Sequence, residues 1–479
     1  MLFNSVEFLV FLPIVFLLFW FLCKSKYQQN LLIVIASYVF YGWWDWRFLL
    51  LIAFTSLCSY GSGIAIHRFI GNRKRQKLIS AANIVVNLLI LGVFKYYNFF
   101  AENFAGLFSS FGYQMDAITL NIILPVGISF YTFQALSYSI DVYQGKIKPT
   151  KDIIHFFAYI SFFPQLVAGP IERASHLLPQ FSYKRKFNYG QAVDGLRQML
   201  WGFFKKLVVA DNCAFFVNQY WDGYEYLSSM MLIQIAVLFT FQIYGDFSGY
   251  SDIAIGCAKL FGIKLKKNFD YPYFSRNIGE FWRRWHISLM TWFKDYIYIP
   301  MGGSRCSKFK AAYNVFIVFF ISGLWHGANW TFVVWGGYNA LLLITANFLG
   351  WNNKYTQSND KKSTYTVYNY VGMLLTFMFV VFGWIIFRSL SLSQAYHYIV
   401  AISSNSNLVS ANHISNTCMT GIVMMIIIEW AQRSKDHAFQ LSNSGLMRYR
   451  PIRWFFYYGM AILTYTMSGL SQDFIYFQF

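Results

Sequence analysis

Apolar and polar stretches alternate along most of this 479-residue chain. Many apolar stretches approach the roughly 17–20 residues that a helix needs to cross a hydrocarbon core of about 30 Å. The pattern predicts membrane spans at residues 5–23, 30–43, 47–66, 78–97, 119–140, 228–245, 312–324, 328–349, 368–388, 392–403, 417–431 and 453–470, of which 392–403 is the weakest. We therefore expect an all-α polytopic membrane protein with about 11 transmembrane helices plus re-entrant helices.

The middle of the chain departs from this regular alternation. Residues 153–169 are apolar but short and have basic residues on both sides, which predicts a re-entrant segment enclosed by protein. Lysines 205 and 206 interrupt the stretch 195–220, which predicts a partly interfacial position. The polar insertion YGDFSGYSD follows the span at 228–245. From Lys264 to Lys310 the sequence is basic and rich in Trp and Tyr, which predicts partly embedded helices at the cytoplasmic interface.

Basic residues mark alternate loops between the predicted spans. Lys24 and Lys26 follow the first span, a cluster from Arg68 to Lys77 follows the third, and Lys146 to Lys151 follow the fifth. The positive-inside rule therefore places the N-terminus outside, and counting the later spans places the C-terminus outside too. The first apolar stretch has no basic leading region, so we interpret it as a span and not as a signal peptide.

Composition agrees with a membrane protein and argues against a nucleic-acid-binding one. Hydrophobic residues make up 57% of the chain and charged residues 12%, whereas soluble proteins average about 25% charged residues. The net charge of +19 lies in short loops between apolar stretches, where it encodes topology. The six cysteines are scattered without a C-x-x-C pair, so neither a disulfide framework nor a metal site is expected. With no repeat or linker, residues 1–479 are predicted to form a single domain.

His326 is the first candidate for chemistry, because titratable groups at membrane depth are costly and are functional candidates by default. It lies between the apolar runs Val315–Leu324 and Trp330–Ala346. Gly323 and Gly327 flank it, which predicts either a close helix approach or a break in the helix. A structural histidine bonded to a backbone carbonyl is equally compatible with these residues.

His286 is the second candidate, within GEFWRRWHISLMTWFKDYIYIP. If this stretch is one helix, Trp282, Trp285 and His286 share a face, and Glu280 pairs with Arg284 at i,i+4. An interfacial aromatic and basic helix with an incidental histidine is the alternative.

Two aspartates in FQIYGDFSGYSDIAIG need partners within an apolar region. We expect Asp246 and Asp252 to form structural ion pairs with arginines of the stretch RNIGEFWRRW. The candidates for this set of ion pairs are Asp246, Asp252, Glu280, Arg283 and Arg284.

Five stretches run in order from Leu124 to Ala340: LPVGISFYTFQALSYSIDVYQG, FFPQLVAGPIER, FQIYGDFSGYSDIAIG, NFDYPYFSRNIGEFWRRWHISLMTWFKDYIYIPMGGSR and GLWHGANWTFVVWGGYNA. Together they resemble the membrane-bound O-acyltransferase family, in particular its bacterial alginate O-acetyltransferase-like branch. A lone WHG means little, whereas five long motifs in order are specific. The resemblance implies a ring of tilted helices around a central funnel, with the motif core at residues 124–340.

By this resemblance His326 matches the family's central histidine and His286 its second, less uniform one. The resemblance implies that acetyl-CoA or another acyl thioester arrives from the cytoplasm, with no bound cofactor, and that an acceptor hydroxyl arrives from outside. His326 is then the base that removes the hydroxyl proton, a contribution worth roughly 10²–10⁴-fold in rate. His286 is expected to position substrate or to support the oxyanion. The basic surface from Lys264 to Lys310 could attract the phosphates of coenzyme A, although topology alone also explains those charges.

The C-terminal residues 471–479, SQDFIYFQF, form an aromatic tail predicted to lie outside. Its pattern of Phe474, Tyr476 and Phe479 is similar to the tail found in this branch and in accessory peptides of related teichoic-acid D-alanylation systems, where the tyrosine is proposed as an acyl relay. The resemblance implies that Tyr476 accepts the acyl group and swings out to a partner. A simple interfacial anchor is the alternative.

The resemblance implies O-acetylation of an extracytoplasmic polysaccharide, either an exopolysaccharide such as alginate or a cell-wall glycan, at the bacterial cytoplasmic (inner) membrane. Because the chain lacks a soluble domain with a Ser–His–Asp site, a separate extracytoplasmic hydrolase-like O-acetyltransferase is the expected partner. Acylation of a lipid or membrane-bound acceptor is one alternative. A proton-coupled transporter that uses His326 and Asp246 is another, although no inverted halves are visible.

Overall fold

The computed structural model describes residues 1–113, 116–120, 122–167, 169–352, 365–405, 414–441 and 445–475, with the side chains of 445 and 446 left aside. The chain forms two compact units, Met1–Val193 with Cys257–Lys266, and Asp194–Gly256 with Lys267–Phe479. Within the described ranges both units consist of helices, and no β-strand occurs there. The all-α class predicted from the sequence is confirmed, and the single domain stays a prediction.

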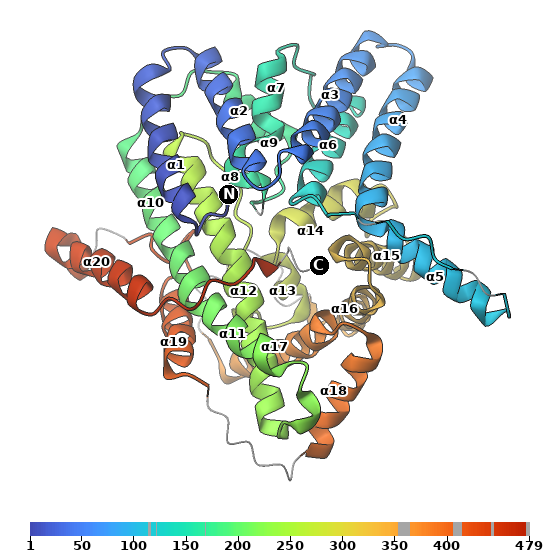
Figure 1. Cartoon of the computed structure of the whole chain (residues 1–479), viewed down its shortest axis with the longest axis vertical. Coiled ribbons are helices and arrows are strands. Elements are labelled where there is room, and N and C mark those ends of the chain that lie inside the picture. The colour runs from blue at the N-terminus through green and yellow to red at the C-terminus, as the bar shows by residue number, and fades with distance from the viewer. Residues whose placement is uncertain are drawn as a thin grey trace. The chain divides into compact units, whose positions relative to one another are not determined.

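The first unit is built mainly from the N-terminal helices. They are α1 (Val6–Leu17), α2 (Lys26–Gly42), α3 (Arg47–Arg68), α4 (Arg73–Leu91), α5 (Tyr97–Ser110), α6 (Ile128–Tyr143), α7 (Ile153–Ile160), α8 (Phe163–Leu166) and α9 (Ala174–Leu177). Figure 1 shows α3, α4 and α6 side by side. Ile52 of α3, Leu91 of α4 and Ile128 of α6 lie in one buried cluster, which gives the unit its core.

The fifth predicted span begins later than the apolar pattern suggested. Its helix, α6, starts at Ile128 and not at residue 119, because Pro125 and Gly127 end the preceding extended chain. Gly127 has φ +74°, a left-handed conformation that glycine adopts without a side-chain clash. In its described residues, the predicted re-entrant segment 153–169 contains the short helices α7 and α8, and at about 1.5 Å per residue neither is long enough to cross a membrane.

The second unit contains the remaining helices, apart from the ends of two that begin or finish in the first unit. They are α10 (Tyr189–Phe203), α11 (Asp211–Tyr220), α12 (Ser229–Leu260), α13 (Ile278–Arg284), α14 (Ile287–Phe293), α15 (Lys308–His326), α16 (Trp330–Phe348), α17 (Val367–Arg388), α18 (Leu392–Ser404), α19 (Asn416–Ala431) and α20 (Arg450–Thr466). A π-helical turn, Phe204–Ala210, connects α10 with α11, and another, Lys294–Tyr298, follows α14. These turns carry several of the buried polar side chains described below.

Helix α12 corrects the prediction of a span that ends at residue 245. Its 32 residues continue without interruption through the polar insertion YGDFSGYSD. The insertion remains helical because its two aspartates are neutralised by lysines 205 and 206. Both lysines are almost fully buried within the protein, and the partly interfacial position of residues 195–220 stays a prediction. Buried charges are tolerated when they are paired, and these lysines and aspartates pair with one another.

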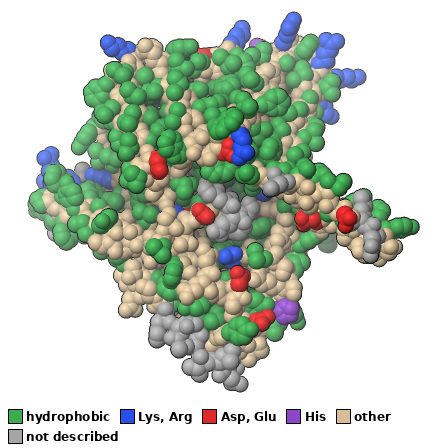
Figure 2. Space-filling view, viewed as in Figure 1, with side chains coloured by type: hydrophobic (Ala, Val, Ile, Leu, Met, Phe, Trp, Pro, Cys, Tyr) green, Lys and Arg blue, Asp and Glu red, His purple; other side chains and the backbone are tan. Residues whose placement is uncertain are grey.

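Several helices have the length and composition of membrane spans. Among the described residues six qualify: α3, the helical stretch Arg73–Ser110, α12, α15, α16 and α17. Helix α1 exposes large apolar side chains such as Val6 and Leu9, and Figure 2 shows hydrophobic side chains covering the surface in the region of α1 to α4. Exposed apolar surface of this extent suits contact with lipid. The protein is a polytopic integral membrane protein, and the number of spans beyond these six stays a prediction.

Candidate functional site

His326 is the last residue of α15, at the reversal of the chain into α16. The next residue, Gly327, is extended, and Asn329 begins α16 by accepting the backbone N–H of Thr331 at 3.0 Å. The break that the sequence predicted beside His326 is therefore present. It places the imidazole at the tip of a helical hairpin instead of in the middle of a helix.

The two helices of this hairpin pack closely and run antiparallel. Gly323 of α15 faces Phe332 of α16, and Gly336 of α16 faces Phe319 of α15. A Cβ atom on Gly323 would collide with the carbonyl oxygen of Phe332, so the absence of a side chain permits this approach. The close helix approach predicted from Gly323 is confirmed, and it fixes the direction from which His326 leaves the hairpin.

Aromatic rings surround the buried His326 side chain. Its ring centroid lies 4.9 Å from that of Trp325, 5.1 Å from Trp335 and 5.2 Å from Phe387. Trp384 stacks on Trp335 at 5.7 Å and extends the aromatic wall. Such a wall limits the access of water to the imidazole.

His286 lies in a left-handed turn between α13 and α14. Its φ of 44° and ψ of 52° are unusual for a residue with a side chain, and such conformations persist where surrounding contacts hold them. Helix α13 ends at Arg284 and Trp285 is extended, so the prediction that Trp282, Trp285 and His286 share one helical face is wrong. Local sequence favoured a continuous helix, and contacts from a distant residue, Asn268, break it.

Asn268 organises the turn at His286 through both its backbone and its side chain. Its carbonyl oxygen accepts the N–H of Ile287 at 2.8 Å. Its Oδ1 atom accepts the Oγ–H of Ser288 at 2.9 Å and lies 3.1 Å from Nδ1 of His286, while its Nδ2 donates to Ser251 at 3.1 Å. Because an amide oxygen only accepts, Nδ1 of His286 is the donor. The neutral ring then carries its lone pair on Nε2.

The structure brings the two candidate histidines to one aromatic residue. The Trp325 ring lies 5.8 Å from the ring of His286 and 4.9 Å from that of His326. Both histidines therefore line the surroundings of a single indole. Neither Asn268 nor Trp325 was predicted from the sequence, because each contacts His286, which is distant from it along the chain.

The ion pairs of the two α12 aspartates differ from those that the sequence predicted. Nζ of Lys206 lies 2.9 Å from Oδ1 of Asp246, and Nζ of Lys205 lies 2.5 Å from Oδ2 of Asp252. The predicted arginine partners are wrong, since the two lysines on the turn Phe204–Ala210 lie beside α12 and reach these carboxylates first. The pairing makes these aspartates part of the buried framework.

Glu280 forms the pair that the sequence predicted and one more. Its carboxylate lies 2.6 Å from Arg284 and accepts two hydrogen bonds from the Arg276 guanidinium at 3.0 Å. The predicted i,i+4 contact with Arg284 is confirmed. Arg283 instead lines a cavity of about 380 Å³, together with Lys294 and with the apolar side chains of Trp282, Ile287, Met290, Val315 and Phe319.

The cavity lined by Arg283 is much larger than a second cavity beside Asn268. A volume of about 380 Å³ falls within the range of small-molecule pockets. A second cavity of about 20 Å³ lies beside Asn268 and is lined by polar groups that include Lys205, Asp252 and Glu429. It has room for about one water molecule, and so cannot take an acyl donor.

The last two described residues of the C-terminal tail are buried in the second unit. Phe474 and Ile475 have no exposed surface, and the N–H of Ile475 donates to Oδ2 of Asp246 at 2.7 Å. Tyr476 and Phe479 lie outside the described residues. The sequence predicted an interfacial anchor or a relay, and the buried contact of Ile475 with α12 was not predicted.

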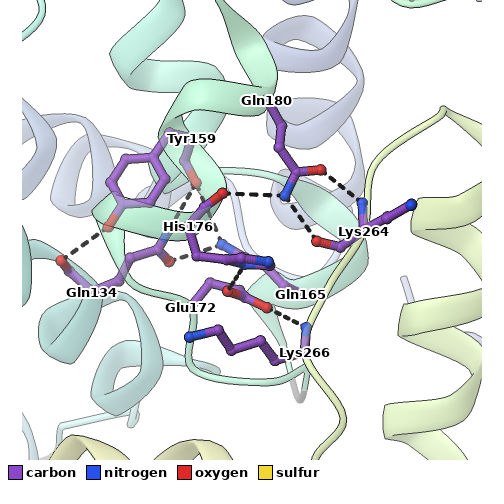
Figure 3. Close-up of polar contacts among 8 residues, drawn as sticks. All are labelled: Gln134, Tyr159, Gln165, Glu172, His176, Gln180, Lys264 and Lys266. Atoms are coloured by element: carbon purple, nitrogen blue, oxygen red, sulfur yellow. Dashed lines mark hydrogen bonds and ion pairs between the residues drawn. The ribbon is translucent and has the colours of Figure 1, made fainter. Parts of the chain in front are cut away.

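A group of polar side chains in the first unit belongs to the motif FFPQLVAGPIER and its neighbours (Figure 3). Gln134 donates to the Tyr159 carbonyl oxygen at 2.7 Å and accepts from Gln165 at 2.9 Å. These bonds join α6, α7 and α8 through buried amides. They give the Gln134 amide both an acceptor and a donor, which explains its presence by architecture.

The same motif also fastens an extended segment of the first unit. Glu172 binds His176 at 2.7 Å and accepts the backbone N–H of Lys266, and Gln180 bonds both the N–H and the carbonyl of Lys264, as Figure 3 shows. Two side chains therefore hold residues 264–266 as a neighbouring strand would. These bonds use the main chain, so they hold the segment whatever side chains it carries.

The other histidines that the structure describes lie at the surface or bind structural acceptors. His397 is exposed on α18, and His413 lies outside the described residues. Three more are bound to nearby acceptors: His155 to the Leu178 carbonyl, His176 to Glu172 and His437 to Asp194. Among the described residues no three His, Cys, Asp or Glu side chains gather closely enough to hold a metal ion.

Comparison with known proteins places this site in context. The family model for the membrane-bound O-acyltransferase family matches residues 38–393, which include both candidate histidines. The chain is 40% identical over 412 residues to the probable alginate O-acetylase AlgI of Pseudomonas aeruginosa, covering 84% of this chain and 75% of that protein. It is 35% identical to the peptidoglycan O-acetyltransferase of Helicobacter pylori, covering 92% and 91% respectively. A teichoic acid D-alanyltransferase of Bacillus subtilis is 29% identical over 56% of this chain and 69% of that protein.

Proposed function

Since this chain belongs to the membrane-bound O-acyltransferase family and is an acyltransferase, we propose that it moves acetyl groups across the bacterial cytoplasmic membrane for O-acetylation of an extracytoplasmic polysaccharide. The relatives named for alginate and for peptidoglycan modification support a glycan as the final acceptor. The observation that carries the proposal is the buried His326 at the hairpin tip, walled by aromatic rings within the matched region.

In the proposed reaction His326 is the general base. It removes the proton of an acceptor hydroxyl as that oxygen attacks the carbonyl carbon of the acetyl thioester. The new C–O bond forms, the C–S bond breaks, and the proton passes from His326 to the departing thiolate. His286, which also contacts Trp325, positions the substrate or supports the oxyanion.

The cavity of about 380 Å³ is the proposed approach of the donor. Arg283 and Lys294 supply cationic groups for the phosphates of an acyl thioester such as acetyl-CoA, and the apolar wall suits its pantetheine arm. Trp282 of this cavity lies 5.7 Å from Trp335, which in turn contacts His326. One aromatic contact therefore connects the proposed donor cavity with the environment of the base.

Tyr476 is the proposed first acceptor. Ile475, the residue before it, is held by Asp246 on α12, one residue before Phe247, whose ring lies 4.7 Å from that of His286. The phenol oxygen would take the acetyl group as an ester and release its proton to His326. A glycan hydroxyl then attacks that ester, and the phenol recovers a proton as the acetyl group leaves. A separate extracytoplasmic hydrolase-like O-acetyltransferase is the proposed partner for this second transfer.

The central test replaces His326 by alanine in a strain that lacks its own copy of the protein. We expect acetyl ester in the extracytoplasmic polysaccharides to fall to the level of the deletion strain, while the membrane-inserted protein is present in normal amount. His397→Ala, at an exposed position on α18, is the control and should restore full ester content. Normal ester content with His326→Ala would refute the assignment of the base.

The relay has its own test in Tyr476→Phe, which removes one hydroxyl oxygen and nothing else. We expect polymer acetylation to be lost, and an acetylated C-terminal peptide to be found by mass spectrometry in the parent alone. Acetylation that persists in Tyr476→Phe would exclude the relay while leaving the role of His326 in place.

A further inference from the structure

Residues 207–218 of the second unit contact the end of the chain, both just before the C-terminal tail and at Gln472 within it. Asn212 donates to the Met467 carbonyl at 2.9 Å, and the N–H of Gly469 donates to the Leu207 carbonyl at 3.0 Å. Further along, Asn218 donates to the side-chain oxygen of Gln472 at 3.2 Å. The tail is thus fastened repeatedly before it reaches its buried end.

Lys206 is the centre of the last and most buried set of these contacts. Its ammonium group lies 2.8 Å from Asp211, 2.9 Å from Asp246 and 3.1 Å from the carbonyl oxygen of Gln472. The Gln472 carbonyl oxygen accepts a hydrogen bond from this ammonium group, while the two carboxylates lie at ion-pair distance from it. One of the three oxygen neighbours of this buried lysine therefore belongs to the tail.

The charges in this cluster also favour the tail. Lys206, Asp211 and Asp246 are each almost fully buried, and two carboxylates face one ammonium group. A buried negative charge needs donors beyond its ion pair. The N–H of Ile475 supplies one to Asp246 at 2.7 Å. Both ends of the segment from Gln472 to Ile475 therefore satisfy the cluster through the backbone.

The same contacts set the end of the tail beside a candidate catalytic histidine. The ring of Phe474 lies 4.2 Å from Tyr250 and 6.3 Å from Phe247 of α12, and Phe247 lies 4.7 Å from His286. Asp246, Phe247 and Tyr250 all belong to the polar insertion YGDFSGYSD. This explains why a helix that is otherwise apolar carries polar groups at that level.

We propose that Lys206, Asp211 and Asp246 form a receptor for the backbone of the C-terminal tail, and that they are positioning residues that hold Gln472–Ile475, the segment directly before Tyr476, beside the histidine site. The role given to Tyr476 rests on the proposed function, whereas the seating of the tail does not. The receptor binds main-chain groups of Gln472 and Ile475, so it fixes the path of the backbone and does not depend on the side chains of these residues.

The test measures how well the tail is buried. Ile475→Cys keeps the backbone N–H and serves as a reporter in purified protein treated with a maleimide, with the parent chain as the blank for native cysteines. Asp246→Asn in this background removes the charge that holds the tail. We expect maleimide labelling to become about tenfold faster or more. The loss of a hydrogen bond to a charged group raises the fraction of time that the tail is detached and its cysteine exposed.

Asp252→Asn is the matched control. Asp252 also lies on α12 and also pairs with a buried lysine, Lys205, yet no described contact joins it to the tail. When Asp252→Asn is combined with the reporter Ile475→Cys, we expect the reporter cysteine to stay protected from the maleimide. Equal labelling in both variants, or unchanged labelling in Asp246→Asn, would overturn the proposal.

A second pair of variants leaves the buried cluster intact in case Asp246→Asn does not fold. Ile475→Pro removes the N–H that Asp246 accepts, and Ile475→Val keeps it. Phe474→Cys reports the labelling in both. We expect fast labelling with proline and slow labelling with valine, and equal rates would overturn the proposal.

The outcome is separable from that of the relay. If Tyr476→Phe acetylates normally while Asp246→Asn frees the tail, the relay fails and the receptor stands. If Tyr476→Phe abolishes acetylation while Asp246→Asn leaves the reporter protected, the relay stands and the receptor fails.

Discussion

The Oδ1 atom of Asn268 lies 3.1 Å from Nδ1 of His286 and holds the imidazole in the tautomer that carries its lone pair on Nε2. In Asn268→Ala the ring loses this acceptor and the strained turn loses its support. We expect the protein to be destabilised by about 1–3 kcal/mol and polymer acetylation to fall. Thermal unfolding in detergent and ester content of the polymer measure the two effects.

A control separates the acceptor from the rest of the asparagine. Ser251→Ala removes the partner of Asn268 Nδ2 and leaves Oδ1 untouched, so acetylation should remain close to that of the parent. Asn268→Asp keeps an oxygen toward His286 and should retain more activity than Asn268→Ala. If Ser251→Ala and Asn268→Ala lose activity equally, the tautomer is not what Asn268 contributes.

The stability of the protein should depend on pH through His286. Burial lowers the pKa of this histidine to about 3, while in the unfolded chain it is about 6.5. The folded protein therefore keeps the ring neutral where the unfolded chain binds a proton. The contribution to stability is complete above pH of about 6.5 and is lost progressively as the pH falls from there toward about 3.

His286→Gln tests this dependence, since glutamine keeps a donor for Asn268 and does not titrate. Between pH of about 7.5 and about 5 the unfolding temperature of the parent should fall more than that of the variant. Parallel curves for the two proteins would show that His286 is not buried in its neutral form.

Hydropathy correctly predicted those helices whose ends are set by the local sequence. The span predicted at 47–66 is the helix Arg47–Arg68, and the span at 368–388 is Val367–Arg388. Both are uniform apolar stretches bounded by polar residues, so composition alone fixes them. His326 was found in the same way, because a titratable residue between two apolar runs is conspicuous on its own.

The sequence could not predict features that depend on distant partners. Helix α12 passes through its polar insertion only because Lys205 and Lys206, about forty residues earlier, neutralise its aspartates. His286 adopts its left-handed turn because Asn268 holds it. A periodic pattern contains no information about such pairs, so both were predicted with the wrong local structure or the wrong partner.

Close packing in the hairpin of His326 gives a third prediction. In Gly323→Ala the new methyl group would meet the carbonyl oxygen of Phe332, and overpacking of this kind costs about 1–3 kcal/mol. We expect a lower unfolding temperature together with reduced acetylation, because the hairpin tip carries the base. Gly337→Ala, where the added group meets no atom within 4 Å, should be neutral or slightly stabilising. Equal loss in both variants would mean that the close contact of Gly323 with Phe332 is not what the substitution disturbs.

The carboxylate of Glu280 supports α13 through two arginines, which gives a fourth prediction. Glu280→Gln removes the charge between Arg276 and Arg284, and Arg276 is almost fully buried. Breaking a buried pair in this way costs about 3–5 kcal/mol, since a charge is left without its partner. Asp45→Asn, which breaks a surface pair with the exposed Arg47, should leave the unfolding temperature unchanged. If Glu280→Gln proved as stable as the parent, the pair would be dispensable and the turn at His286 would have to be held by Asn268 alone.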